Sequence, residues 1–194
     1  MNYKKMEEFI LNKLKTELPK HLEYHSIHHI TDVFSAAESI AKSENVSEYE
    51  VCLLKTAVLF HDAGYTIQGD QHEAISCSMA MDTLGDYDYT KEEIEMICGM
   101  IMATQIPQRP KNILEEIICD ADLDYLGRDD YWKISRSLFN EMNLSKPMSE
   151  REWLNVQIKF FESHEYCTDT AIGLRKAQKD KHLEEIKKQL ADLK

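Results

Sequence analysis

An apolar run in the first third of the chain ends abruptly in the dipeptide His61-Asp62, which is soon followed by Gly64. Such a run predicts the last turns of a buried helix, which would carry an imidazole and a carboxylate to the point where the chain turns. Both groups bind metal ions, but neither can hold an ion alone. The remaining ligands must therefore come from other parts of the sequence.

Two further side chains are candidates to complete a metal site. His29 lies upstream of the dipeptide and Asp122 lies downstream of it. With His61 and Asp62 they make two imidazoles and two carboxylates, a set that suits a borderline or hard divalent cation. This set leaves the identity of the ion open among manganese, iron, zinc, magnesium and cobalt.

Three aspartates interrupt the apolar segment around Asp122. Ile117 and Ile118 indicate a buried helix, in which an unpaired charge is costly. Positions two apart on a helix point to different sides, so we expect Asp124 to reach solvent or a helix end. This explanation suits Asp120 and Asp122 less well, and we expect a metal ion or a charged partner for at least one of them.

A second group of histidines lies around His29. His25 precedes it by four residues, and on a helix that begins at or before His25 both side chains lie on one face and can serve one centre. His28 falls on a different face, and we expect it to be a surface or capping residue.

The composition limits the partners of this chain. Its 194 residues, 43% of them hydrophobic, suffice for one domain with a sizeable core. A formal charge of -12 argues against a nucleic-acid duplex, which needs a basic face, but leaves open a small phosphorylated substrate beside a bound cation. Scattered cysteines, the lack of a signal-peptide pattern and short apolar runs predict a cytoplasmic protein without membrane association. The oligomeric state stays open.

Apolar residues recur every three or four positions and predict an all-α fold, a single compact multi-helix bundle over residues 1–194. Ser47, Thr90 and Ser149 each precede a glutamate by three residues, which is typical of capping boxes at helix starts. The expected helices cover residues 3–18, 27–43, 47–61, 72–84, 90 to before Pro107, Pro110 to Gly127, 129–141, a segment from Ser149, and 166–193.

The chain resembles the HD superfamily of metal-dependent phosphohydrolases. The pattern of that family is a histidine, a His-Asp pair one helix later and an aspartate in a distant helix, which match His29, His61-Asp62 and Asp122. The segment Tyr24–Val33 is also similar to the phosphodiesterase branch of the family. The resemblance covers about residues 20–175.

This resemblance implies a function and roles for individual residues. The four matched residues are expected to bind one metal ion that activates water against a phosphomonoester or phosphodiester of a nucleotide or cyclic nucleotide. His25 is expected to protonate the leaving alcohol, and Asp62 to orient the water as well as bind the metal. Members with two bound ions carry extra histidines after the pair, whereas here only His72 is available.

Three residues are candidates for substrate binding. Tyr65 and His72 follow the His-Asp pair, and Arg128 follows the segment that holds Asp122. A guanidinium can bind phosphate through two hydrogen bonds, although a solvated Arg128 paired with Asp129 or Asp130 is the favoured alternative, and His72 can instead cap the helix that it begins. His164 is expected to be a packed core residue.

Two other functional classes share these features. A metal-binding sensor or interaction module without turnover would keep the ligands, and a metal-loaded protein inert toward phosphoesters would favour it. An iron oxygenase would share the helical scaffold but needs more histidine ligands than this sequence contains.

Overall fold

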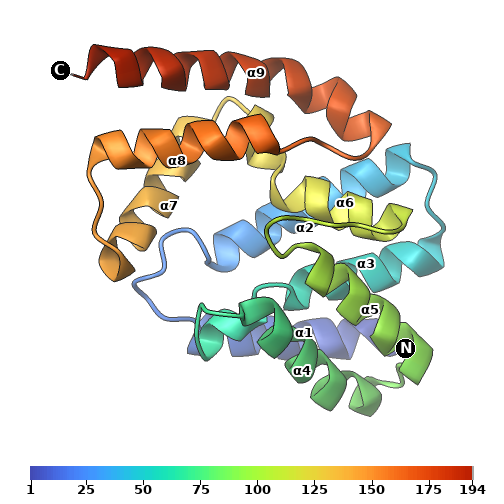
Figure 1. The fold of residues 1–194 in the computed structure, drawn as a ribbon. Helices are drawn as coiled ribbons and strands as arrows, with labels where there is room; N and C mark the ends of the chain where they lie inside the picture. Colours follow the sequence, from blue (N-terminus) through green and yellow to red (C-terminus); the bar gives the residue numbers. More distant parts are fainter. Residues whose placement is uncertain (194) are drawn as a thin grey trace.

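The computed structural model describes residues 1–193, and within this range it contains helices and no strand. The predicted all-α fold is therefore confirmed (Figure 1). Lys194, the last residue of the predicted domain, lies outside the described residues. The nine α-helices of the described chain are α1 (Tyr3–Glu17), α2 (Ile27–Ser43), α3 (Glu48–Phe60), α4 (His72–Leu84), α5 (Lys91–Ala103), α6 (Ile113–Asp122), α7 (Tyr131–Ser145), α8 (Glu150–Ser163) and α9 (Asp169–Asp192).

Helix starts with a capping box are predicted correctly. Ser47, Thr90 and Ser149 each accept a hydrogen bond from the backbone N–H three residues later, and the glutamate at that position bonds back to the backbone N–H of the capping residue. These bonds satisfy N–H groups that have no partner inside the helix. Because all the partners are close in sequence, the local pattern suffices to place α3, α5 and α8.

The predicted helix from Pro110 to Gly127 is wrong at both ends. Helix α6 begins at Ile113, because the Asn112 side chain accepts hydrogen bonds from the N–H groups of Leu114 and Glu115, each at 3.1 Å. It ends at Asp122, and a short 3₁₀ helix, η3 (Asp124–Gly127), follows. A Cβ atom on Gly127 would lie 2.4 Å from the backbone oxygen of Arg175, so glycine is needed here for the close approach of α9.

The C-terminal helix begins at Asp169, whereas the sequence pattern predicts a start at Tyr166. The backbone N–H groups of Cys167 and Thr168 donate to the carboxylate of Asp120, each at 2.8 Å, and this holds the segment before the helix in an extended form. The Thr168 side chain then caps the helix by accepting from the N–H of Ala171. A buried aspartate from α6 thus sets where α9 starts.

The buried side chains form two clusters. The larger one is built by α1 to α6, and the smaller one by η3, α7, α8 and α9 with Tyr24. In Figure 1, α8 and α9 run side by side across the top, while α1, α4 and α5 lie at the bottom. Helices α2, α3 and α6 pack on one another in the middle, and the predicted metal ligands lie in α2, in the turn directly after α3 and at the end of α6.

None of the helices in residues 1–193 combines the length and apolar character needed to cross a bilayer.

Candidate metal centre

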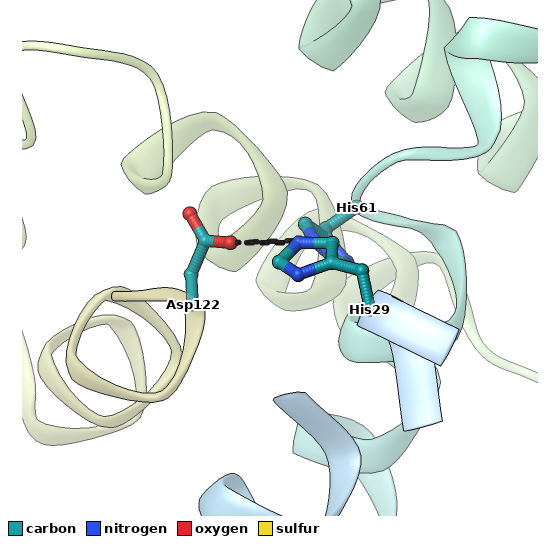
Figure 2. A group of neighbouring side chains, drawn as sticks. All are labelled: His29, His61 and Asp122. Atoms are coloured by element: carbon teal, nitrogen blue, oxygen red, sulfur yellow. Dashed lines mark hydrogen bonds and ion pairs between the residues drawn. The ribbon is translucent and has the colours of Figure 1, made fainter. Parts of the chain in front are cut away.

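Three of the predicted ligands converge on one point from three helical segments (Figure 2). One ligand atom from each of His29, His61 and Asp122 lies within 4.8 Å of the other two. The Nε2 atoms of the two histidines are 3.4 Å apart, and Asp122 Oδ1 lies 3.2 Å from His29 Nε2 and 3.6 Å from His61 Nε2. Separations of this size are those between neighbouring ligands of a single small ion.

Asp62 faces the same point from the turn after α3. Its Oδ2 atom lies 3.4 Å from His29 Nε2 and 3.3 Å from His61 Nε2. This oxygen is buried and accepts no conventional hydrogen bond from the described residues. A buried carboxylate oxygen without a partner is costly, and a cation between the four side chains would remove that cost. The donor set therefore fits a divalent metal ion.

A backbone contact fixes the orientation of the His61 ring. His61 Nδ1 lies 2.8 Å from the carbonyl oxygen of Val58, which can only accept, so Nδ1 carries the proton of the neutral ring. The lone pair of Nε2 is then directed at His29 and Asp62. A second contact from outside the ligand set is common for histidines that bind metals.

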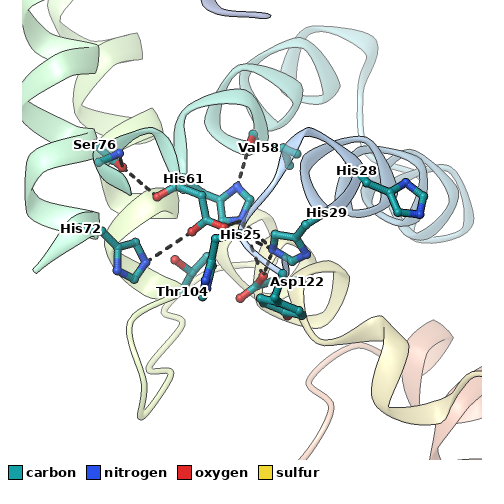
Figure 3. A network of polar contacts seen from close by, with 12 residues as sticks. His25, His28, His29, Val58, His61, His72, Ser76, Thr104 and Asp122 are labelled. Atoms are coloured by element: carbon teal, nitrogen blue, oxygen red, sulfur yellow. Dashed lines mark hydrogen bonds and ion pairs between the residues drawn. The ribbon is translucent and has the colours of Figure 1, made fainter. Parts of the chain in front are cut away.

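The turn that holds His61 and Asp62 is fastened to α4. Ser76 Oγ donates to the carbonyl of His61 at 2.9 Å and accepts from the N–H of Gly64 at 2.8 Å (Figure 3). A Cβ on Gly64 would lie 2.2 Å from the backbone oxygen of His72. Glycine is therefore required by close packing at this position, and Ser76 is a supporting residue that the sequence pattern did not single out.

The buried carboxylates of the cluster are stabilised by nearby positive charge. Burial would lower the pKa of His29, but the nearby carboxylates of Asp122 and Asp62 raise it to about 9. Burial opposes ionisation of the carboxylates as well, yet the two imidazoles lower the pKa of Asp122 to about 2 and hold the pKa of Asp62 well below its usual range. In the absence of a metal ion, protons on the histidines take the place of the cation.

His25 lies in the loop before α2, which begins at Ile27 as predicted, so His25 and His29 do not share a helix face. Ser26 between them has extended backbone. The loop still brings the two imidazoles to a ring-centre distance of 6.1 Å. His25 Nδ1 is paired with the carboxylate of Glu141 in α7, which also accepts from the N–H groups of Tyr24 and His25. These contacts leave Nε2 of His25 available.

Glu141 has no signal in the sequence, because 116 residues separate it from His25. Burial pushes the pKa of Glu141 upward, but the hydrogen bonds from His25 and Tyr24 outweigh it and lower the pKa. The carboxylate is therefore ionised near neutral pH and fixes the orientation of the imidazole.

Tyr65 and His72 both lie beside this histidine. The rings of His25 and Tyr65 are stacked with centres 3.9 Å apart, and the rings of Tyr65 and His72 are 4.4 Å apart. His72 Nε2 is 3.4 Å from Asp62 Oδ1, and its Nδ1 contacts the Gly69 carbonyl at 3.1 Å. The two predicted substrate residues thus border the candidate centre.

Arg128 does not reach the cavity, which corrects its assignment to substrate binding. Its guanidinium bonds both carboxylate oxygens of Asp32 at 2.8 Å and pairs with Asp130 at 2.6 Å. Asp124, expected to reach solvent or a helix end, lies just past the end of α6, where it is buried and accepts two hydrogen bonds from Arg175 at 2.6 and 3.1 Å. The aspartates around Asp122 therefore have different partners, and those of Asp120 and Asp124 are structural.

His28 and His164 lie outside the cluster. His28 points away from it on the other side of α2 (Figure 3). His164 is buried after the last turn of α8, with its ring stacked on Phe160 and edge-on to Tyr166. Its position is that of a packed residue, as expected from the sequence.

One cavity of about 330 Å³ borders the candidate centre. Asp62, Asp122 and His25 line one part of it, together with Tyr65 and His72. The other part lies between α7 and α8. The carboxylates of Asp62 and Asp122 are therefore open to a small molecule, as an active site requires.

Comparison with known proteins identifies the family. The HD domain family matches residues 26–125, about half of the chain and all four candidate ligands, and the chain belongs to this family. A protein of Clostridium beijerinckii described as uncharacterized is 34% identical over 76 residues, which cover 38% of this chain and 48% of that protein. The chain therefore spans about half the length of this relative.

A solved structure has the same fold. The crystal structure of a predicted HD superfamily hydrolase from an uncultured Thermotogales bacterium aligns over 96% of this chain and 92% of its own, with a TM-score of 0.64 and 18% identity. At this identity the match supports the arrangement of the helices and carries no residue-level assignment.

Proposed function

We propose that this HD-domain protein is a metal-dependent phosphohydrolase that cleaves a phosphomonoester or phosphodiester. The observation that carries the proposal is the buried, unpartnered Oδ2 of Asp62 beside His29, His61 and Asp122, at the edge of a cavity that also holds His25. The solved relative described as a predicted hydrolase and the membership in the HD-domain family support the same reaction type.

The four side chains would hold one divalent ion. When bound, such an ion polarises a phosphoryl oxygen and lowers the pKa of a bound water to about 7. His29 and His61 contribute neutral nitrogens, and Asp62 and Asp122 contribute negative charge that offsets the ion. The Oδ1 atom of Asp62 faces His72, so this carboxylate has one oxygen for the ion and one that can orient a water in the cavity.

The chain's own proton donor is His25. Its Nδ1 is occupied by Glu141, so proton transfer to a leaving alkoxide falls to Nε2. A histidine whose other nitrogen is held by a carboxylate keeps a fixed orientation, which proton transfer needs. Tyr65 stacks on the ring and limits its rotation.

The test measures metal content and phosphate release together. The protein is loaded with Mn²⁺, and phosphate release is followed with aryl phosphates, nucleotides and cyclic nucleotides, because the resemblance points to a nucleotide ester. His61→Ala and Asp122→Asn are expected to lose both metal and turnover. His28→Ala is the matched control on α2 and is expected to keep both. A metal-loaded protein inert toward the whole panel would refute the enzyme and favour the binding module.

A further inference from the structure

The part of the cavity that lies away from the metal ligands is lined by apolar side chains. It is lined by Leu138 and Met142 of α7, by Trp153, Val156 and Phe160 of α8, and by Leu126 of η3. Trp153 and Leu126 are only 7% and 1% exposed, although both border the cavity. Binding of an apolar group in a space of this size is favourable, because the group displaces water from the apolar wall.

The polar groups of this wall are already paired with one another. Gln157 Nε2 donates to Ser135 Oγ at 2.6 Å and is bonded to the hydroxyl of Tyr131. All three residues are at most 6% exposed. Because these groups satisfy one another, they offer little to the polar edges of a nucleobase or to the hydroxyls of a ribose.

The charges of the cavity also limit its ligand. Within the described residues, no lysine or arginine lines it, and Glu73 adds a carboxylate beside His72. A divalent ion bound by Asp62 and Asp122 leaves no net positive charge once the two carboxylates are counted. The additional charges of a diphosphate or triphosphate would therefore be buried without partners.

We propose that the substrate is a monophosphate ester of a hydrophobic alcohol, whose aryl or alkyl group occupies the space between α7 and α8. This inference rests on the proposed function for the reaction. It deepens that function by assigning the phosphate to the metal ligands and the organic group to a wall made of Leu138, Met142, Trp153, Val156 and Phe160.

Alkylphosphonates test this assignment without requiring turnover. Binding of methyl-, propyl- and hexylphosphonate to the Mn²⁺-loaded protein is measured by calorimetry. The dissociation constant is expected to fall about fourfold for each methylene that enters the cavity, which corresponds to about 0.8 kcal/mol. The value of kcat/KM for the matching alkyl phosphates is expected to rise in parallel, because these primary alcohols are similar leaving groups.

Two matched variants locate the organic group. Val156 is 43% exposed and borders the cavity, so Val156→Asp places a charge on the wall with little risk to folding. This variant is expected to raise the dissociation constant of hexylphosphonate by more than about tenfold and to change that of methylphosphonate by less than about twofold. Ile172, 38% exposed on α9 and outside the cavity, is the control, and Ile172→Asp is expected to change neither.

The outcomes separate this inference from the proposed function. Equal affinity for all three phosphonates, or tighter binding of a nucleoside monophosphate or ATP than of hexylphosphonate, overturns the hydrophobic substrate even when phosphate is released. An affinity that rises with chain length in a protein that hydrolyses no ester supports the ligand class and refutes the enzyme. An equal response to Val156→Asp and Ile172→Asp places the alkyl group elsewhere and overturns the assignment.

Discussion

His25 combines two features that a proton donor needs. One ring nitrogen is held by Glu141, and the ring itself lines the cavity, where it stacks on Tyr65 near the candidate metal ligands. The proposed ligand set of His29, His61, Asp62 and Asp122 does not include it. Loss of the imidazole should therefore affect the reaction and spare metal binding.

We predict that His25→Ala retains metal and loses about 10²–10⁴-fold in turnover, the usual effect of a positioned acid or base. The loss should be smaller for an aryl phosphate than for an alkyl phosphate, since a stable leaving anion needs little protonation. Metal analysis and turnover with both esters check this. A fall in metal content, or equal slowing of both esters, would contradict the acid role.

His164 illustrates a different kind of buried histidine. Neither of its ring nitrogens has a hydrogen-bond partner among the described residues. Burial, together with the nearby charge of Lys179, lowers its pKa from 6.5 to about 4. The folded state keeps this ring neutral, whereas the unfolded chain binds a proton below about pH 6.5. His164 therefore lowers the free energy of unfolding as the pH falls from about 6.5 toward 4.

The variant His164→Phe should remove this acid sensitivity while retaining the stacking on Phe160. The parent is expected to lose on the order of 2–3 kcal/mol of folding free energy relative to the variant between about pH 7 and pH 4. Urea unfolding across this range measures the difference, and His21→Phe at an exposed position is the control. A difference that does not change with pH would show that His164 is protonated in the folded protein.

At the scale of the helices, caps decide where the elements begin. Pro110 fits the first position of a helix, but the chain stays irregular until Asn112, whose side chain binds the first free N–H groups of α6. The site depends on this start, because Asp122 is the last residue of the same helix.

Asn112→Ala is expected to lower the free energy of unfolding by about 1 kcal/mol, the usual cost of a lost N-cap. Lys111→Ala, a neighbouring exposed position, should change it by less than about 0.5 kcal/mol. Urea unfolding measures both. If Pro110→Ala lowers the free energy of unfolding more than Asn112→Ala does, the result would favour a helix that starts at Pro110.

At the scale of the molecule, the proposed metal ligands join α2, the turn after α3 and the end of α6, which are far apart in the sequence. An ion that binds only when these segments are assembled must stabilise the folded state. The effect is independent of catalysis, so it tests the centre even in a protein without turnover.

We expect Mn²⁺ at about 100 times its dissociation constant to add about 2.7 kcal/mol, which raises the Tm of a domain of this size by roughly 5–11 °C. Asp62→Ala should abolish the shift, while Asp70→Ala in the exposed loop should keep it. Thermal unfolding with and without the ion checks this. A full shift in Asp62→Ala would remove Asp62 from the ligand set.

The sequence by itself determined the features that depend on near neighbours. The helical periodicity and the capping boxes at Ser47, Thr90 and Ser149 involve contacts within about four residues, so the pattern predicts the all-α fold and these helix starts correctly. The candidate ligands could be named because an ionisable side chain in an apolar helix needs a partner.

Only the tertiary structure decided which partner each of these groups has. Asp120 supports the start of α9, Arg128 is bound by Asp32, and Glu141 holds His25, although 96 residues or more separate the last two pairs. The apolar wall between α7 and α8 also depends on how these two helices pack. Such contacts depend on the path of the whole chain, which hydrophobic periodicity does not specify.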